Sequence, residues 1–260
     1  MIQKVKIYVL GSSGFVGSAI EKHMLNKGFH VIGINRKNYG KYKNTVCDIF
    51  INSNGSSKKK LAEEDPQLDF ELNVHTTLKT IFDFKFNKYI LISTVDVYNN
   101  LEEAKYNDET TTINPLTLSN YGFDKWVTEQ LVKKYCKSWL IFRLGGMVGG
   151  GLKKNAIYDL LNTKSLFVHP ESEYQYINTR EVAELIYKLK DRSKELFNVC
   201  GEGTIKLEDV AKTLKIKLDK RLYTLSKQCY KVNISKIKNQ VKITPTKKTI
   251  EDFVRSYTKA

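Results

Sequence analysis

Short apolar runs alternate with stretches of helical periodicity through the first part of the chain. In the stretch from Phe15 to Asn26, apolar side chains recur at helical spacing, which predicts an amphipathic helix. Helices are predicted in the same way at 72–84 and 120–135, and the apolar runs predict buried strands at 5–10, 30–34, 47–51, 89–93 and 139–144. Apolar strands that alternate with helices are typical of a parallel sheet covered on both faces, so the sequence predicts an α/β fold.

The pattern is looser after Gly151. Helical spacing predicts helices at 156–161, 180–189, 207–214 and 249–257, and short apolar runs predict strands at 166–169 and 197–200. No repeat or clear linker separates this part from the rest. We therefore predict a dinucleotide-binding domain at 1–150 and a small substrate-covering subdomain at 151–260 that is interleaved with the sheet.

Bulk composition is that of a globular protein, with 41% hydrophobic and 27% charged residues in a chain of 260. The apolar run near the N-terminus is too short to span a bilayer, and we recognise no signal peptide. The four cysteines are dispersed and the four histidines lack metal-ligand spacing. These features favour a cytoplasmic protein with reduced thiols, no metal and no membrane association.

The formal net charge of +15 raises the question of nucleic-acid binding. Most of the excess is lysine in short scattered runs, and no run interleaves with aromatic residues to form a base-stacking platform. A solvated basic surface is the preferred interpretation, and RNA binding is kept only as a minor alternative. The positive field would still attract anionic cofactors and substrates.

A glycine-rich segment, Gly11-Ser12-Ser13-Gly14-Phe15-Val16-Gly17, lies between the first predicted strand and the first predicted helix. In this position one glycine allows a tight turn, one lets the backbone approach a pyrophosphate, and one lets the helix pack close to the strand. The context of strand, glycines and helix makes this a strong dinucleotide signal of the Rossmann type. The expected cofactor contacts here are Gly11, Ser13, Gly14, Phe15, Val16 and Gly17.

The residues after the second predicted strand bear on the choice of cofactor. Proteins that bind NAD usually carry an acidic residue there, which contacts the ribose hydroxyls. This chain has Asn35 and Arg36 instead, and a guanidinium can bind a 2′-phosphate through two hydrogen bonds. The sequence therefore favours NADP, with NAD as the alternative.

Tyr121 and Lys125 stand four residues apart in a predicted helix and so lie on the same side of it. A tyrosine with an ordinary pKa near 10 is a poor base at neutral pH, but an ammonium one turn away favours its phenolate. Thr94, at the end of the fourth predicted strand, could donate a hydrogen bond to the same substrate oxygen.

These motifs together resemble the extended short-chain dehydrogenase/reductase family, which contains sugar-nucleotide epimerases, dehydratases and reductases. The resemblance covers nearly the whole chain and implies a Rossmann-type, doubly wound sheet with a C-terminal substrate-binding subdomain. It implies that Tyr121 is the acid/base, that Lys125 lowers its pKa and binds ribose, and that Thr94 polarises the reacting oxygen. Segments that carry the resemblance besides these residues are 11–17, 52–55, 93–98, 176–183 and 197–199.

The resemblance also implies further ligand contacts. Asn52, Ser53 and Asn73 are expected to line the cofactor. Expected substrate contacts are Ser93, Asp96, Gly146 and Tyr176, with Ser93 a weaker alternative to Thr94 as the group that polarises the oxygen.

The chain departs from the family pattern at three places. About ten residues separate Arg36 from Cys47, where the family usually has an additional strand, so Asp48 is assigned to the next strand. Gly146 replaces a common asparagine and Tyr174 a common arginine, which puts a standard nucleotide-sugar substrate in doubt. Val95 replaces one acid of the dehydratases, so a dehydratase is less favoured than a reductase or an epimerase.

The preferred hypothesis is therefore an NADP-dependent oxidoreductase that reduces a 4-keto sugar with Tyr121 as acid/base, and the family resemblance implies that this sugar is nucleotide-activated. A sugar-nucleotide epimerase with retained NAD is the alternative within the same class. A non-catalytic NADP-binding regulator on the same fold is the alternative from another class. The family resemblance also suggests a homodimer that uses the helix of Tyr121.

Overall fold

The computed structural model describes residues 4–57 and 59–257, and the chain forms two compact units in it. The first unit comprises residues 1–99, 112–144 and 180–197, and the second comprises residues 100–111, 145–179 and 198–260. These units interleave along the chain, whereas the predicted boundary at residue 150 divides it once; that boundary stays a prediction.

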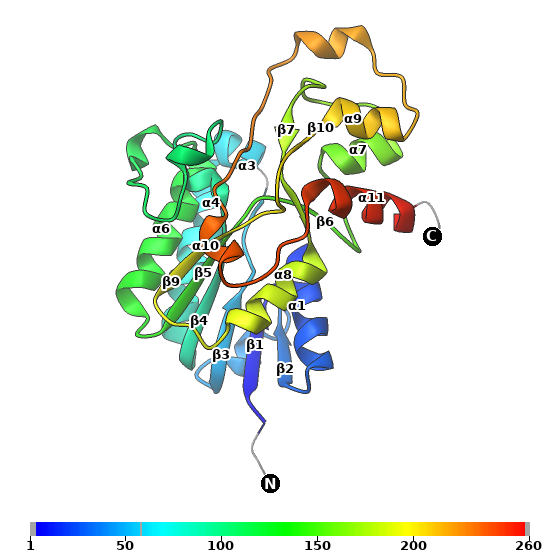
Figure 1. Ribbon diagram of the computed structural model, residues 1–260. Helices are drawn as coiled ribbons and strands as arrows, with labels where there is room; N and C mark the ends of the chain where they lie inside the picture. The colour runs from blue at the N-terminus through cyan, green and yellow to red at the C-terminus, as the bar shows by residue number, and fades with distance from the viewer. Residues whose placement is uncertain (1–3, 58, 258–260) are drawn as a thin grey trace. The chain divides into compact units, whose positions relative to one another are not determined.

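A six-stranded sheet organises the first unit, in the order β2-β1-β3-β4-β5-β9 (Figure 1). The pairs β1–β2, β1–β3, β3–β4 and β4–β5 are all parallel. The strands are β1 (Lys6–Leu10), β2 (His30–Ile34), β3 (Val46–Asn52), β4 (Lys85–Thr94), β5 (Trp139–Leu144) and β9 (Glu195–Val199).

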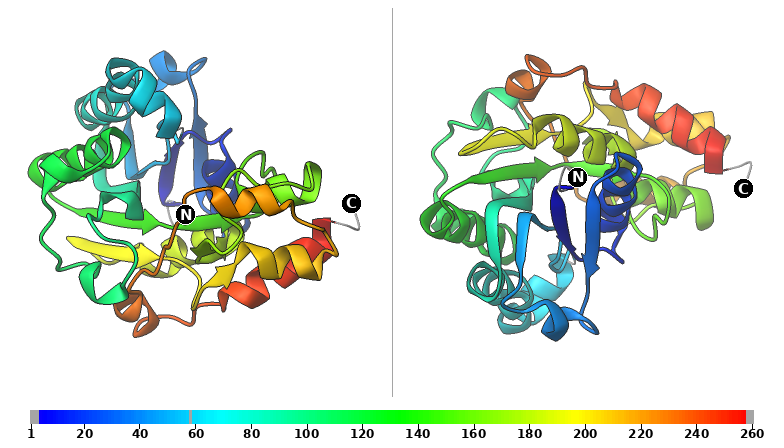
Figure 2. Two further views of the ribbon diagram at one scale, coloured as in Figure 1. Left: turned by 90° about the horizontal axis from the view of Figure 1, so that it is seen from above. Right: turned by 90° about the horizontal axis from the view of Figure 1, so that it is seen from below.

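Helices cover both faces of this sheet, as Figure 2 shows for α1 and α8 on one side and α5 and α6 on the other. Side chains of α1 and α8 touch directly, since the rings of His23 and Tyr187 lie 5.8 Å apart. The helices of the first unit are α1 (Phe15–Asn26), α2 (Tyr39–Tyr42), α3 (Lys59–Glu64), α4 (Pro66–Phe70), α5 (Thr76–Asp83), α6 (Asn120–Tyr135) and α8 (Thr179–Leu189), with short turns η1 (Glu71–His75), η2 (Val95–Val97) and η4 (Pro115–Thr117).

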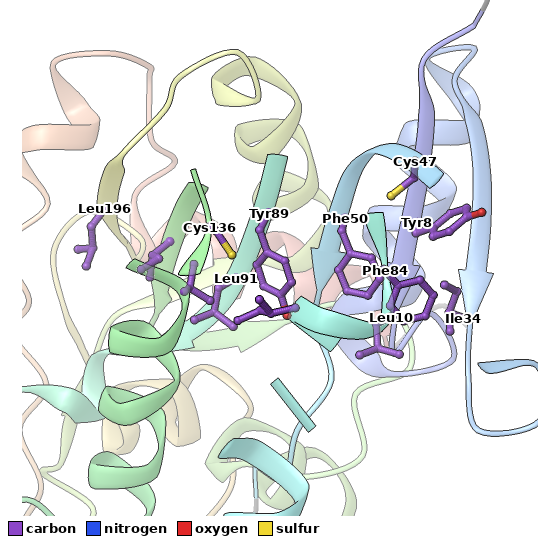
Figure 3. Packing of buried hydrophobic residues seen from close by; sticks show 13 residues of the cluster. Tyr8, Leu10, Ile34, Cys47, Phe50, Phe84, Tyr89, Leu91, Cys136 and Leu196 are labelled. Atoms are coloured by element: carbon purple, nitrogen blue, oxygen red, sulfur yellow. The ribbon is translucent and has the colours of Figure 1, made fainter. Parts of the chain in front are cut away.

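The core of the first unit follows from the period of two along each strand. Successive residues point to opposite faces, so the nearly continuous apolar runs bury both faces of the sheet, as the sequence predicts. One cluster packs against α5 and α6, where Phe50 stacks on Tyr89 at 5.3 Å (Figure 3). Its labelled members are Tyr8, Leu10, Ile34, Cys47, Phe50, Phe84, Tyr89, Leu91, Cys136 and Leu196.

The second unit holds two small two-stranded sheets, β6–β8 and β10–β7. Strand β6 pairs with β8 in parallel, and β10 pairs with β7 antiparallel. Its elements are β6 (Gly146–Val148), β7 (Glu173–Tyr174), β8 (Tyr176–Asn178), β10 (Ile205–Lys206), η3 (Ala104–Tyr106), α7 (Ala156–Asn162), α9 (Leu207–Thr213), η5 (Lys220–Thr224), α10 (Ser235–Lys238) and α11 (Thr246–Tyr257).

The predicted Rossmann-type, doubly wound α/β fold is confirmed, and most predicted elements lie within a few residues of their expected bounds. The strand predicted at 166–169 is wrong, because this segment forms an irregular loop with a bend after α7. The helix predicted at 72–84 is only partly right, because its first residues form the π-helical turn η1 between α4 and α5.

The shortened connection between Arg36 and Cys47 has a clear structural counterpart. The four-residue helix α2 links β2 directly to β3, and β2 stands at the edge of the sheet. Asp48 lies in β3, where a carboxylate oxygen accepts from the backbone N–H of Lys6 at 2.7 Å.

Within 4–57 and 59–257, no helix is long and apolar enough to cross a membrane. The same residues contain no group of three or more His, Cys, Asp or Glu side chains arranged to hold a metal ion. All four cysteines are free thiols, and three of them, Cys47, Cys136 and Cys200, are buried.

Candidate active site

The glycine loop follows β1 and is held in a tight turn. Gly11 has φ +79°, a left-handed conformation that favours glycine, and its N–H donates to the carbonyl of Ile34 at 3.0 Å. A Cβ on Gly17 would lie 2.1 Å from the carbonyl oxygen of Gly11. The loop and helix α1 therefore approach each other as closely as two glycines allow.

Helix α1 begins directly after this loop, with Gly14 at its N-cap. Gly14 has no side chain that could accept from the first-turn N–H groups, so these groups and the positive end of the helix dipole suit an anion. Ser13 and Gly14 are exposed, and Phe15 and Val16 are partly exposed. Four of the predicted cofactor residues of this loop, Ser13, Gly14, Phe15 and Val16, thus lie at one accessible helix end, whereas Gly17 is buried.

The sheet order reverses between β1 and β3, and a ligand of an open α/β sheet binds at such a point. The loop after β3 packs against the glycine loop, since the Ser53 hydroxyl donates to the Leu10 carbonyl at 2.6 Å. Asn52 is buried and donates to the Tyr89 hydroxyl at 2.9 Å, while its Oδ1 accepts from the N–H of Asn54. The side chains of Asn52 and Ser53 therefore shape this loop from inside.

Asn35 and Arg36 follow β2. The Oδ1 of Asn35 accepts from the backbone N–H of Lys37 at 2.9 Å, and the Oδ1 of Asn38 accepts from that of Asn35 at 2.8 Å, so the turn is built from asparagines. Arg36 is exposed beside this turn. Within the described part of the chain its guanidinium has no carboxylate partner.

Tyr121 and Lys125 lie on one buried face of α6. Ser119 caps the helix by accepting from the N–H of Gly122 at 3.1 Å. A Cβ on Gly122 would lie 2.4 Å from the carbonyl oxygen of Asp96, so this end of α6 presses against the segment that follows β4. The structure thus brings the helix of the Tyr–Lys pair to the strand end that carries Thr94.

Thr94 donates its hydroxyl proton to Oδ2 of Asp96 at 2.9 Å, and its oxygen accepts from the backbone N–H of Asp96. The other oxygen of Asp96 forms an ion pair with Lys59 of α3 at 2.6 Å. Ser93, by contrast, is buried and donates to Glu129 at 2.6 Å. Both hydroxyls are therefore engaged, but the partner of Thr94 is partly exposed whereas Glu129 is fully buried, and this difference favours Thr94 as the hydroxyl that a substrate oxygen can reach.

Lys125 occupies a buried position next to Asn73 and Gly55. Its ammonium donates to the carbonyl of Ile92 at 3.3 Å, and burial lowers its pKa to about 8 despite the charges of Glu129 and Asp69, which act to raise it. A Cβ on Gly55 would lie 2.4 Å from Oδ1 of Asn73 and 3.5 Å from the Nζ of Lys125. Only glycine fits at position 55. The backbone of Gly55, the side-chain amide of Asn73 and the ammonium of Lys125 therefore lie close together.

The π-helical turn η1 explains how Asn73 reaches this place. A π turn adds a residue to the helical repeat and often marks a functional site. Asn73 is buried, its Nδ2 donates to the carbonyl of Asp69 at 3.1 Å, and its Oδ1 has no hydrogen-bond partner within the described residues. A buried acceptor without a donor fits a ligand hydroxyl, such as one of a ribose.

Gly146 and Tyr176, predicted as substrate contacts, are direct partners in the β6–β8 pair of the second unit. A Cβ on Gly146 would lie 2.9 Å from the Tyr176 ring, which explains why no asparagine stands there. Tyr176 is fully buried and stands at 5.9 Å from the ring of Tyr174, which stacks on Tyr230. The rings of Tyr174, Tyr176 and Tyr230 thus occupy the region where the family resemblance implies an asparagine at position 146 and an arginine at position 174.

Sequence reasoning missed several residues of this region. Asp124, to which the sequence motifs assign no role, is buried on the same face as Tyr121 and Lys125. The spacing of three residues from Tyr121 could have revealed it. Lys59 and Asp69 have no local pattern that singles them out, because their significance depends on contacts with distant segments.

Comparison with known proteins adds a family and a set of similar folds. Residues 7–200 match the NAD dependent epimerase/dehydratase family. No curated protein sequence matches the chain.

Several solved structures are similar in fold. A dTDP-4-dehydrorhamnose reductase from Bacillus anthracis, in complex with NADP, has a TM-score of 0.81 at 15% identity and covers 97% of this chain and 99% of its own. A UDP-galactose 4-epimerase has a TM-score of 0.74 at 19% identity, with 97% and 99% covered. A UDP-glucuronic acid 4-epimerase from Bacillus cereus, in complex with UDP-glucuronic acid and NAD, has a TM-score of 0.76 at 18% identity, with 97% and 100% covered.

Proposed function

Because the chain belongs to the NAD dependent epimerase/dehydratase family, we propose that it is an NAD(P)-dependent oxidoreductase that acts on a sugar linked to a nucleotide. The observation that carries the proposal is the buried Tyr121–Lys125 face of α6, pressed against the strand end of Thr94. This face and the glycine loop belong to the same unit and to the carboxyl edge of one parallel sheet. Ligands of such sheets bind at that edge.

Several features of the first unit fit a dinucleotide. The uncapped N-terminus of α1 suits a pyrophosphate, and the orphaned Oδ1 of Asn73 beside Lys125 suits a ribose hydroxyl. Residues that would hold the cofactor are Gly11, Ser13, Gly14, Phe15, Val16, Gly17, Asn35, Arg36, Asn73 and Lys125, with Asn52 and Ser53 supporting the loop behind them. When bound, a nicotinamide supplies or accepts a hydride.

The chain's own residues would manage the proton that accompanies this hydride. Tyr121 would give a proton to a sugar carbonyl oxygen, or take one from a hydroxyl, while the Lys125 ammonium stabilises its phenolate. The Thr94 hydroxyl would turn from Asp96 to donate to the same oxygen. Asp96 stays paired with Lys59 and so serves better as the partner of Thr94 than as a free base.

NADP is the favoured cofactor because Arg36 is exposed after β2 and no acid stands at this place. We expect Arg36→Asp to weaken NADPH binding by about 10- to 100-fold, since it replaces a cation by an anion beside a 2′-phosphate. NADH affinity should stay the same or improve. Calorimetric titration of both cofactors, with Lys37→Asp as a matched control, checks this. Unchanged NADPH affinity in Arg36→Asp would leave the preference for NADP without support.

Within this class we propose reduction of a 4-keto sugar ahead of epimerisation. A preference for NADP suits net reduction, whereas an epimerase retains NAD and recycles it. The experiment follows cofactor absorbance while the purified protein is offered 4-keto sugar nucleotides. Continuous oxidation of NADPH is expected. Interconversion of epimers without net turnover would make the protein an epimerase instead.

A homodimer is proposed through the outer faces of α4, α5 and α6. Phe82 is 65% exposed and its ring touches that of Tyr135 at 5.3 Å, and Phe70 and Phe123 are also exposed. Exposed aromatic side chains on neighbouring helices are typical of an interface. We expect light scattering to give twice the chain mass and Phe82→Glu to halve it. A monomeric wild-type protein at micromolar concentration would refute the dimer.

The proposed setting is the cytoplasm, with a small-molecule partner and neither nucleic acid nor membrane. Lysine is spread over many elements, and some lysines form ion pairs such as Lys43–Asp83, Lys188–Glu184 and Lys248–Asp252. This distribution supports a solvated basic surface.

A further inference from the structure

Lys59, the first residue of α3, reaches the segment that follows β4. Its Nζ lies 2.6 Å from Oδ1 of Asp96, which stands 37 residues further along the chain. The lysine side chain is 53% exposed, whereas the aspartate side chain is only 14% exposed. The sequence motifs assign no role to Lys59, and neither the hydride nor the proton of the proposed reaction passes through it.

Helix α3 is also anchored further along its length. The side-chain amide of Asn120 donates to the carbonyl of Ala62 at 3.1 Å and to Oε2 of Glu63 at 3.2 Å. Ala62 is completely buried, and Asn120 directly precedes Tyr121 in α6. The helix that presents the lysine is therefore held against the N-terminus of the helix that carries the proposed acid/base.

The carboxylate of Asp96 lies between this ammonium and Thr94. Its Oδ1 binds the Lys59 ammonium, and its Oδ2 accepts from the Thr94 hydroxyl at 2.9 Å. The backbone N–H of Asp96 donates to the Thr94 oxygen at 3.2 Å. A substrate oxygen that accepts from the Thr94 hydroxyl, at about 2.8 Å, would lie within about 6 Å of this carboxylate. The charge of Asp96 is therefore close to any oxygen on which Thr94 acts.

This proximity affects the reduction of a carbonyl. The carbonyl oxygen gains negative charge as hydride reaches its carbon and before the proton from Tyr121 has fully transferred. An uncompensated carboxylate nearby repels that charge and also holds the Thr94 hydroxyl in its own hydrogen bond. At an effective dielectric constant of about 20, repulsion over about 6 Å slows a reaction by about 10- to 100-fold. An ammonium on the other oxygen of the carboxylate offsets this repulsion.

We propose that Lys59 is a positioning residue for this reaction, which acts by neutralising Asp96 beside the substrate oxygen. The ion pair leaves the Thr94 hydroxyl able to turn from the carboxylate to the substrate. This role rests on the proposed function, because Lys59 acts through Asp96 and Thr94 and not on the substrate directly. A purely mechanical role, in which the ion pair only fastens α3, predicts a different result when both partners are replaced.

Lys59→Met is expected to lower kcat for the sugar substrate by about 10- to 100-fold with little change in KM, because Asp96 keeps its charge and loses this cation. Lys59→Arg keeps the cation and should stay within about threefold of the wild type. Lys59→Met/Asp96→Asn should be at least about fivefold more active than Lys59→Met, because it also removes the repelling charge. Lys60→Met, an exposed change in the same helix, is the matched control and should keep the wild-type rate.

Two kinetic results would contradict the role of Lys59. One is a wild-type kcat in Lys59→Met while the wild-type protein turns over its sugar, which leaves the proposed function intact. The other is a double variant no more active than Lys59→Met, which is the result expected if the ion pair only fastens α3. A wild-type protein that turns over no sugar contradicts the proposed function, and the role of Lys59 with it.

The ion pair itself can be tested without sugar or cofactor. Acylation of the full chain with a succinimidyl ester, followed by mass spectrometry, reports how readily each lysine amine reacts. In Asp96→Asn the Lys59 amine should react about two- to fivefold faster than in the wild type, because its anionic partner is gone, while Lys60 should react at an unchanged rate. An unchanged rate at Lys59 in Asp96→Asn overturns the ion pair on which the role depends.

Discussion

Replacing Tyr121 with phenylalanine is expected to lower kcat for the sugar substrate by about 10²- to 10⁴-fold, the usual contribution of a positioned acid/base. The substitution removes only the hydroxyl from a buried ring, so the fold and the dinucleotide affinity should be preserved. Steady-state kinetics together with a cofactor titration measure both quantities. The pattern of lost turnover with retained binding is specific to a proton-transfer role.

A matched control separates this role from a general effect of losing a tyrosine hydroxyl. Tyr106 is exposed and lies outside the proposed site, so Tyr106→Phe should turn over at the wild-type rate. Undiminished activity of Tyr121→Phe would instead support the alternative that the protein is a non-catalytic dinucleotide-binding regulator. In that case the cofactor would bind but the hydroxyl would have no chemical task.

Gly17→Ala is expected to abolish measurable dinucleotide binding and to destabilise the fold by about 3 kcal/mol. The added methyl carbon would lie 2.1 Å from the backbone oxygen of Gly11 and 2.6 Å from the Ser53 hydroxyl. A backbone oxygen cannot rotate away, so helix α1 must shift from β1 and distort the loop that faces the pyrophosphate. Chemical denaturation and cofactor titration measure the two effects.

Gly40→Ala is the matched control for this substitution. Both glycines are helical, but a Cβ at Gly40 meets nothing within 4 Å and its φ is not positive. Alanine at this position should leave cofactor binding unchanged and alter the stability by at most about 1 kcal/mol, in the stabilising direction. Wild-type cofactor affinity in Gly17→Ala would contradict the close packing of loop and helix.

The central sheet could be predicted because its strands carry strong local signals. Apolar runs bounded by polar residues identified β1, β2, β3, β4 and β5, and the alternation with amphipathic helices gave a parallel sheet. The segment at 166–169 shows the limit of this reasoning. Its apolar residues pack as a loop, with Leu166 buried and Phe167 exposed, and periodicity cannot distinguish such a short run from a strand.

The small strands of the second unit were harder to predict. Strands β7 and β10 are each two residues long, and their pairing joins segments that are thirty or more residues apart in the chain. Strand β6 is likewise set by its pairing with β8, where the Tyr176 ring fills the space over Gly146. No local pattern encodes such partners.

The candidate site was predictable where a motif has fixed spacing. The glycine loop and the Tyr–Lys pair can be read from the sequence because each lies within a single turn or a single helix. The buried state of Asp124 depends on α4, and the orientation of Asn73 depends on a π-helical turn, so neither follows from local spacing. The ion pair between Lys59 and Asp96 likewise joins residues that are distant in sequence.

The central claim is that this chain moves a hydride between a nicotinamide and a sugar carbon while Tyr121 moves the proton. The most direct measurement incubates the protein with a keto-sugar nucleotide and with reduced cofactor that is deuterated at the transferable position of the ring. Mass and NMR spectra of the product should place deuterium on the carbon that held the carbonyl, and Tyr121→Phe should give almost none. The protein is offered both keto-sugar nucleotides and sugar nucleotides that an epimerase would interconvert. If the cofactor binds but deuterium reaches none of these sugars, the claim is contradicted.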